Sequence, residues 1–165
     1  MDIVVGVSDM KISNKPESIL VTYSLGSCIG VAVYDPIVRV GGLLHFMLPD
    51  SSLDQEKAKK NPYMFADTGI PQLFKESYEL GAQKNRMKVV VVGGAQVFGG
   101  RDFFNIGKRN HIAVRKIFWK NNVMVNYQDV GGKANRTIKL DIGDGEVWLK
   151  VSENGISRYR VITGR

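Results

Sequence analysis

Cys28 is the only cysteine of the chain, and its local sequence suits a nucleophile. It follows Gly26-Ser27 and precedes Ile29-Gly30, so the chain bends beside the thiol and glycines leave room for a substrate to approach. A tight bend can also aim backbone N–H groups at one point, which the oxyanion of a carbonyl addition requires. A lone cysteine is otherwise a small buried apolar residue, and that interpretation competes with the first.

A nucleophilic thiol needs a base, and the chain has two histidines. His45 lies in an apolar stretch, where it is either a core histidine with one satisfied nitrogen or the base for Cys28. His111 lies at the polar start of a predicted helix, which favours a solvent-facing or capping role. Thr22 precedes Cys28 on a predicted strand, and its hydroxyl could orient an imidazole. From spacing alone, Thr22 is better explained as a β-branched strand residue.

Other site chemistries have weaker support. One cysteine and two histidines in no ligand spacing do not make a zinc site, so the sequence predicts no metal and no cofactor. Residues 93–100 are rich in glycine and follow an apolar strand, but they lack the spacing and the Lys-Ser/Thr pair of a phosphate-binding loop. Glycine-rich packing, or backbone that lines a substrate groove, is the better interpretation of this segment.

Composition describes a globular protein. The chain has 165 residues, of which 44% are hydrophobic and 24% charged, and we expect one domain over residues 1–165. A single cysteine excludes a disulfide framework within the chain. No signal-like N-terminus is present and no apolar run approaches the roughly 20 residues that span a bilayer, so we expect a cytoplasmic protein without membrane insertion.

The charge is uneven along the chain. Residues 101–165 carry thirteen Lys and Arg against six Asp and Glu, and they supply the whole net charge of +7. Such a basic segment fits an acidic partner surface or a nucleic acid, and it also fits a solvated face without a specific partner. The chain has no RNA- or DNA-binding motif, which weighs against nucleic acid.

The elements that must position these side chains are mixed. Strands are predicted over residues 3–7, 18–24, 29–34, 40–48, 88–92 and 123–130, and an antiparallel meander over 137–142, 146–151 and 156–162. Helices are predicted over residues 66–80, capped by Asp67 or Thr68, and 105–120, capped by Asn105.

The polar residues 51–61 are predicted to form a mobile loop, in which Asp54 and the adjoining Asp50 are solvated. Together the predicted elements indicate an α+β or layered α/β domain. If residues 29–34 and 40–48 form a hairpin, Cys28 and His45 fall near the same end of it.

Several motifs resemble one protein family. TYSLGSCIGV at residues 22–31 resembles the active-site segment of the CheD family, the bacterial and archaeal chemoreceptor glutamine deamidases. HFMLP at residues 45–49 resembles the histidine motif of that family, in the correct order and spacing. Residues 93–95, 105–110 and 129–132 also look like family segments. The resemblance runs from about residue 3 to residue 150.

The resemblance implies a catalytic triad of Cys28, His45 and Thr22 that hydrolyses glutaminyl side-chain amides on chemoreceptors during chemotaxis adaptation. Backbone around Gly26, Ser27 and Gly94 would form the oxyanion site and the substrate groove, inside a pocket too narrow for main chain. We expect a neighbouring imidazolium to lower the pKa of the Cys28 thiol.

The resemblance also implies a fold and partners. The expected α+β fold has mixed β-sheets with two or three helices packed on one face, similar to the catalytic domain of cytotoxic necrotizing factor toxins. The implied partners are chemoreceptors and the CheC phosphatase. In the competing interpretation, the chain is mainly a non-catalytic partner and activator of CheC.

Overall fold

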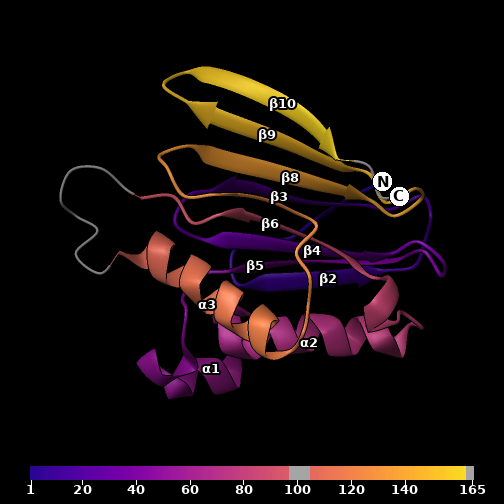
Figure 1. Cartoon of the computed structure of the whole chain (residues 1–165), viewed down its shortest axis with the longest axis horizontal. Helices are drawn as coiled ribbons and strands as arrows, with labels where there is room; N and C mark the ends of the chain where they lie inside the picture. Colours follow the sequence, from indigo (N-terminus) through magenta and orange to yellow (C-terminus); the bar gives the residue numbers. More distant parts are fainter. Residues whose placement is uncertain (97–104, 163–165) are drawn as a thin grey trace.

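Two five-stranded sheets lie face to face, and helices cover the outer face of one of them (Figure 1). The computed structural model describes residues 1–96 and 105–162. In strand order, the first sheet contains β1 (Asp2–Val4), β3 (Ile19–Leu25), β8 (Asn135–Asp141), β9 (Val147–Glu153) and β10 (Ile156–Ile162). The second contains β2 (Asp9–Ser13), β5 (Val40–Phe46), β4 (Ile29–Asp35), β6 (Lys88–Gly93) and β7 (Tyr127–Val130).

Both sheets are mixed. β1 pairs with β3 and β6 pairs with β7 in parallel, while the other neighbouring strands pair antiparallel. The helices are α1 (Gln55–Lys60), α2 (Ala66–Glu79) and α3 (Ile106–Lys120), with 3-10 turns at Ser51–Leu53, Pro62–Met64 and Lys84–Arg86. The predicted α+β fold, with mixed sheets and helices on one face, is confirmed.

The hydrophobic core has two layers because successive strand residues face opposite sides of a sheet. Leu43 and Ala32 belong to the layer between the two sheets, together with Leu20 of β3. Leu44, the next residue of β5, belongs instead to the layer between the second sheet and α2. The facing of any β5 or β4 side chain can therefore be read from its position in the strand.

The predicted hairpin and meander are present. β4 and β5 pair antiparallel, with Asp35 opposite Val40 at the turn, and β8, β9 and β10 follow one another in order. Asn154 and Gly155, which join β9 to β10, both have positive φ, at 52° and 76°. Two such residues are what a tight hairpin turn of this kind requires.

Strand β2 was not predicted. Met10 and Ile12 alternate with Asp9 and Lys11, which is the pattern of a half-buried strand, and this strand pairs with β5 along one edge of the second sheet. The alternation of apolar and polar residues was present in the sequence, but the charges of Asp9 and Lys11 made the segment look like a loop.

The prediction of a mobile loop over residues 51–61 is wrong, because the segment contains a 3-10 turn and the helix α1. Asp50 is exposed, as the sequence predicted, and Asp54 is half-buried. Asp50 accepts a hydrogen bond from the backbone N–H of Ser52, and Asp54 accepts one from Lys57, so each carboxylate caps a short helical turn. Acidic caps at helix starts satisfy free backbone N–H groups and suit the helix dipole.

The predicted cap of α2 is also wrong. The helix begins at Ala66, one residue before Asp67, and Phe65 occupies the cap position without a side-chain bond. The Asp67 carboxylate instead accepts hydrogen bonds from the backbone N–H and the hydroxyl of Ser51, at 2.9 and 2.6 Å. Asn105 occupies the cap position of α3, as predicted, but its side chain makes no capping bond.

In the described part of the chain, no helix is both long enough and apolar enough to cross a membrane.

Candidate active site

His45 points into the layer between the two sheets. It lies two residues after Leu43 on β5, so its side chain faces the first sheet, and it is only 2% exposed. There its Nδ1 lies 2.7 Å from the hydroxyl oxygen of Thr22 on β3. Thr22 is itself fully buried. The contact joins the two sheets through side chains.

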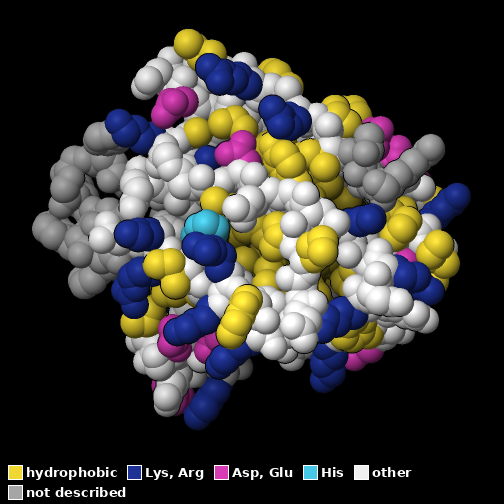
Figure 2. All heavy atoms as spheres, in the orientation of Figure 1, with side chains coloured by type: hydrophobic (Ala, Val, Ile, Leu, Met, Phe, Trp, Pro, Cys, Tyr) yellow, Lys and Arg dark blue, Asp and Glu magenta, His cyan; other side chains and the backbone are white. Residues whose placement is uncertain are grey.

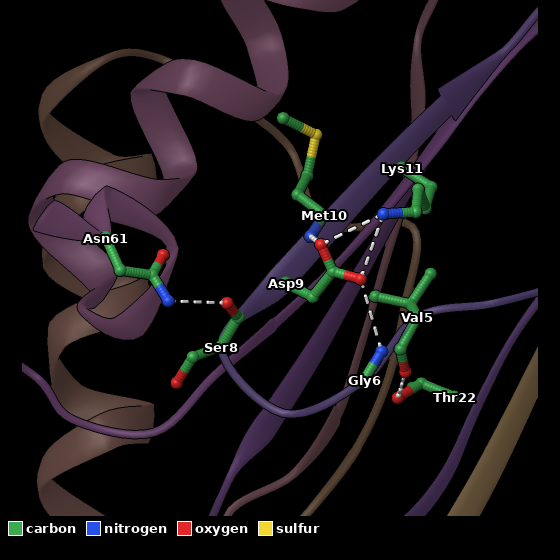
Figure 3. A network of polar contacts seen from close by, with 8 residues as sticks. All are labelled: Val5, Gly6, Ser8, Asp9, Met10, Lys11, Thr22 and Asn61. Atoms are coloured by element: carbon green, nitrogen blue, oxygen red, sulfur yellow. Dashed lines mark hydrogen bonds and ion pairs between the residues drawn. The ribbon is translucent and has the colours of Figure 1, made fainter.

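The proton on His45 can be placed by following the hydrogen bonds of Thr22. The Thr22 hydroxyl donates its single hydrogen to the backbone carbonyl of Val5, at 2.7 Å (Figure 3). Toward His45 the same oxygen must therefore accept, so Nδ1 carries the imidazole proton. This leaves Nε2 with a free lone pair, buried and without a hydrogen-bond partner among the described residues. The arrangement is that of a base held in one tautomer.

Cys28 lies on the same face of the second sheet as His45. The β4–β5 register places Gly30 opposite His45, and Cys28 lies two residues before Gly30. The Cys28 side chain packs against the core between the sheets. Positions that are diagonal across two antiparallel strands are within reach of each other's side chains. The fold therefore places the thiol and the imidazole on the same face of the second sheet, where the imidazole contacts the Thr22 hydroxyl.

Backbone beyond β6 closes one side of the cysteine loop. Gly94 N–H donates to the carbonyl of Cys28 and Ala95 N–H donates to the carbonyl of Gly26, both at 2.9 Å. Gly93 has a φ of +114°, and a Cβ there would collide with the Cys28 carbonyl. Gly94 thus lies beside the backbone of Cys28, and its N–H is bonded within the protein. Its place in a substrate groove stays a prediction. Residues 97–100 of the predicted groove segment lie outside the described residues.

Asn110 of α3 was not predicted as a site residue, yet its side chain hydrogen-bonds to the backbone beside Cys28 and His45. It is 0% exposed, and its Nδ2 donates to the carbonyl of Ser27 at 2.9 Å and to that of Met47 at 2.8 Å. Its Oδ1 has no partner among the described residues. A signal existed in the sequence, because Asn110 lies one helical turn before the buried Val114.

Arg136 of β8 was also missed. This nearly buried guanidinium donates to the carbonyl groups of Gly93 and Gly131, at 3.1 and 2.8 Å, and to the Asp129 carboxylate at 3.0 Å. It ties the end of β6 to the end of β7 behind the cysteine loop. An arginine in a strand gives no hint in the sequence that it is buried.

Burial sets the protonation of the pair. It raises the pKa of the Cys28 thiol, against a smaller lowering by the residue's own backbone N–H. Burial also lowers the pKa of His45 to about 4, although the Asp9 carboxylate opposes the change. Both groups are therefore neutral at pH 7. The expectation that an imidazolium lowers the pKa of the Cys28 thiol is wrong, because the imidazole is neutral and burial dominates both pKa shifts.

His111 does not act as a cap. It lies within α3 and is half-buried, not at the helix start. Burial lowers its pKa, and a hydrogen bond with the Gln128 side chain opposes the shift. Among the described residues, no three His, Cys, Asp or Glu side chains come close enough to hold a metal ion.

Comparison with known proteins gives consistent matches. The family model described as "CheD chemotactic sensory transduction" matches residues 47–151. A protein of Syntrophus aciditrophicus named "Probable chemoreceptor glutamine deamidase CheD 1" is 58% identical over 151 residues, covering 92% of this chain and 94% of that protein.

Two further relatives extend the match. The probable chemoreceptor glutamine deamidase CheD of Solibacter usitatus is 48% identical over 153 residues, covering 93% of this chain and 89% of its own. The protein of that name from Clostridium acetobutylicum is 41% identical over 160 residues, covering 95% of each chain. The family model begins just after His45, whereas these relatives match over at least 93% of this chain.

Proposed function

The chain belongs to the CheD family, and we propose on that premise that it is a chemoreceptor glutamine deamidase whose nucleophile is Cys28. The observation that carries the cysteine mechanism is the tautomer of His45. Its Nδ1–H is donated to a Thr22 oxygen whose own hydrogen is donated to Val5, so Nε2 is bare on the face that holds Cys28.

In the first step, the Cys28 sulfur attacks the side-chain amide carbon of a glutamine. The S–C bond forms, the thiol proton moves to Nε2 of His45, and the carbonyl electron pair moves to oxygen. Because thiol and imidazole are both neutral at rest, proton transfer accompanies attack and no thiolate accumulates beforehand. Base catalysis of this kind contributes about 10²- to 10⁴-fold to the rate.

In the second step, Nε2–H of His45 gives its proton to the amide nitrogen, the C–N bond breaks and ammonia leaves. The resulting thioester on Cys28 is attacked by a water molecule that passes a proton to Nε2. The C–S bond then breaks and the sulfur regains a proton from His45, which leaves glutamate and the starting enzyme. Thr22 accepts from Nδ1–H throughout and keeps the ring in place.

Backbone of the bend at Gly26, Ser27 and Cys28 is the proposed oxyanion site. Gly94 contributes by holding the Cys28 carbonyl, since its own N–H is already bonded there. A glutamine side chain reaches this site through a pocket too narrow for main chain, which separates a deamidase from a protease.

The basic charge of the chain supports an acidic protein partner. Lys and Arg side chains gather over the region that α3 occupies (Figure 2). This helix contains no Asp or Glu and five basic residues, namely Lys108, Arg109, Arg115, Lys116 and Lys120. Such a surface would steer encounter with an acidic chemoreceptor segment. Action in the cytoplasm, a role in adaptation, an interaction with the CheC phosphatase, and one domain over residues 1–165 remain predictions.

The test is deamidation of chemoreceptor fragments, followed by mass spectrometry of the glutamine-containing peptides. We expect Cys28→Ala to abolish conversion of amide to acid while circular dichroism and thermal unfolding stay close to wild type. Ser157→Ala on the exposed strand β10 is the control and should be fully active. Conversion by Cys28→Ala at the wild-type rate would reject the cysteine mechanism.

A further inference from the structure

Three successive backbone carbonyl groups around the thiol are each held by a different donor. The Gly26 carbonyl accepts from Ala95 N–H, and the Cys28 carbonyl accepts from Gly94 N–H. Between them, the Ser27 carbonyl accepts from the side chain of Asn110 on α3, at 2.9 Å. The central peptide of the bend is therefore fixed by a side chain, and the two beside it are fixed by backbone.

Fixing a carbonyl also fixes the N–H of the same peptide. The described residues contain no cis peptide bond, and in a trans peptide the C=O of one residue and the N–H of the next point to opposite sides of the chain. With the Ser27 carbonyl held toward α3, the N–H of Cys28 points away from α3. It donates to no backbone carbonyl of the described residues, and it is the group that opposes the rise in the pKa of the thiol beside it.

That direction is the one that carbonyl chemistry needs. An oxyanion formed by attack of the Cys28 sulfur lies within a bond or two of the sulfur, and a donor fixed beforehand toward it lowers the barrier. Asn110 is well suited to hold the peptide because it is fully buried and its second N–H is donated to Met47, two residues after His45. One amide group thus joins the loop that carries the nucleophile to the strand end that carries the base.

We propose that Asn110 is a positioning residue of the active site, which turns the backbone N–H of Cys28 toward the substrate oxyanion by holding the Ser27 carbonyl. This inference rests on the proposed acyl chemistry at Cys28. It assigns Asn110 no contact with the substrate.

The alternative is that Asn110 only fastens α3 to the sheet. Alkylation and acylation of Cys28 separate the two roles. Iodoacetamide is attacked at a saturated carbon, so its reaction needs the sulfur and no oxyanion donor. With p-nitrophenyl acetate, the sulfur attacks a carbonyl carbon, its proton passes to His45, an S–C bond forms and nitrophenolate leaves. Only this second reaction passes through an oxyanion.

The experiment compares Asn110→Ala with Val114→Ala, both made in the full chain. Val114 is buried one turn further along α3, so its truncation loosens the packing of the helix without removing a bond to the loop. We expect Asn110→Ala to lower the acylation rate, and the kcat for receptor deamidation, by about 10- to 100-fold with KM nearly unchanged, since losing one oxyanion donor outright costs more. Alkylation should stay close to wild type, and Val114→Ala should change neither reaction.

Two outcomes would overturn the inference. Equal losses of alkylation and acylation in Asn110→Ala would show that the sulfur itself had moved. Unchanged acylation would show that the Cys28 N–H does not depend on Asn110. If Asn110→Ala does not fold, Asn110→Asp keeps the shape of the side chain while placing a carboxyl oxygen against the carbonyl groups of Ser27 and Met47. Asn110→Asp should show the same selective loss of acylation. If that variant acylates at the wild-type rate, the result counts equally against the inference.

The outcome for Asn110 can be separated from the outcome for the proposed function. Acylation by p-nitrophenyl acetate involves no receptor, so a selective loss in Asn110→Ala would support the inference even if the wild-type chain deamidated no receptor glutamine. Conversely, wild-type deamidation that depends on Cys28 but not on Asn110 would reject the inference alone.

Discussion

The two ends of the layer between the sheets carry similar side chains and do different things. At one end, Tyr34 of β4 is buried and its hydroxyl donates to the carbonyl of Ile142 at 2.8 Å. At the other end, His45 is equally buried but only one of its two ring nitrogens is bonded. A buried polar ring is costly without a partner, so the Tyr34 contact is explained by stability alone. The unpartnered Nε2 of His45 costs stability instead, so its presence needs a functional explanation.

Removing the imidazole is the strongest way to break this comparison. His45→Asn keeps a side-chain N–H that can donate to Thr22, but it removes the free base. We expect kcat for deamidation to fall by about 10²- to 10⁴-fold, with the fold retained. Mass spectrometry of receptor peptides under single-turnover conditions measures the loss, and a variant with near-normal turnover would show that Nε2 is not the base.

How much of this end could be predicted from sequence depends on how local each signal is. Cys28 and His45 were identified because glycines flank the thiol and a short turn joins the two strands that follow it. The catalytic role of Thr22 was suggested by family resemblance alone, and its spacing favoured a strand residue. The direction of its hydrogen bond depends on Val5, which lies 17 positions away in the chain.

Contacts between residues far apart in the sequence could not be predicted. Asn110 bonds to residues 83 and 63 positions away, and no motif marks such a pair. The protonation of the thiol was predicted in the wrong direction because burial, which dominates both pKa shifts, follows from packing of two sheets. The meander was predicted and strand β2 was not, for a simpler reason. Turn residues mark the ends of the meander strands, whereas charged side chains mask the alternation in β2.

The stability of the protein should depend on pH through His45. Its pKa is about 4 in the folded chain and about 6.5 when unfolded, so between these values the unfolded chain binds a proton that the folded chain does not. The free energy of unfolding therefore falls as the pH drops from 6.5 toward 4, by up to about 3 kcal/mol from this group. Urea unfolding at a series of pH values measures the slope.

Two variants separate His45 from the other histidine. The slope should be reduced in His45→Asn, which has no imidazole to protonate. The pKa of His111 is also lowered by burial, so His111→Gln should reduce the slope by a smaller, separate amount. An unchanged slope in His45→Asn would contradict a neutral, buried His45.

Thr22 tests whether the bonded nitrogen matters as much as the bare one. Thr22→Val is close in shape but leaves the Val5 carbonyl and the Nδ1–H of His45 without partners, so we expect a loss of about 2 kcal/mol in unfolding free energy. Activity should fall to a level between those of wild type and His45→Asn, because the tautomer is no longer held. Thr22→Ser keeps the hydroxyl and should retain most of the activity, and equal activity in the two variants would contradict the orienting role.

Tyr34→Phe sharpens the comparison from the opposite end and should have the smallest effect. It removes only the hydroxyl that donates to Ile142, and the ring still packs between the sheets. Loss of one buried hydrogen bond predicts a decrease of about 1 kcal/mol in unfolding free energy, measured by urea denaturation. Deamidation kcat should be unchanged, because Tyr34 lies six residues beyond Cys28 along a strand that pairs regularly throughout. A substantial fall in kcat would show that the two ends of the layer are mechanically coupled, and that bonding at the far end helps to hold the thiol.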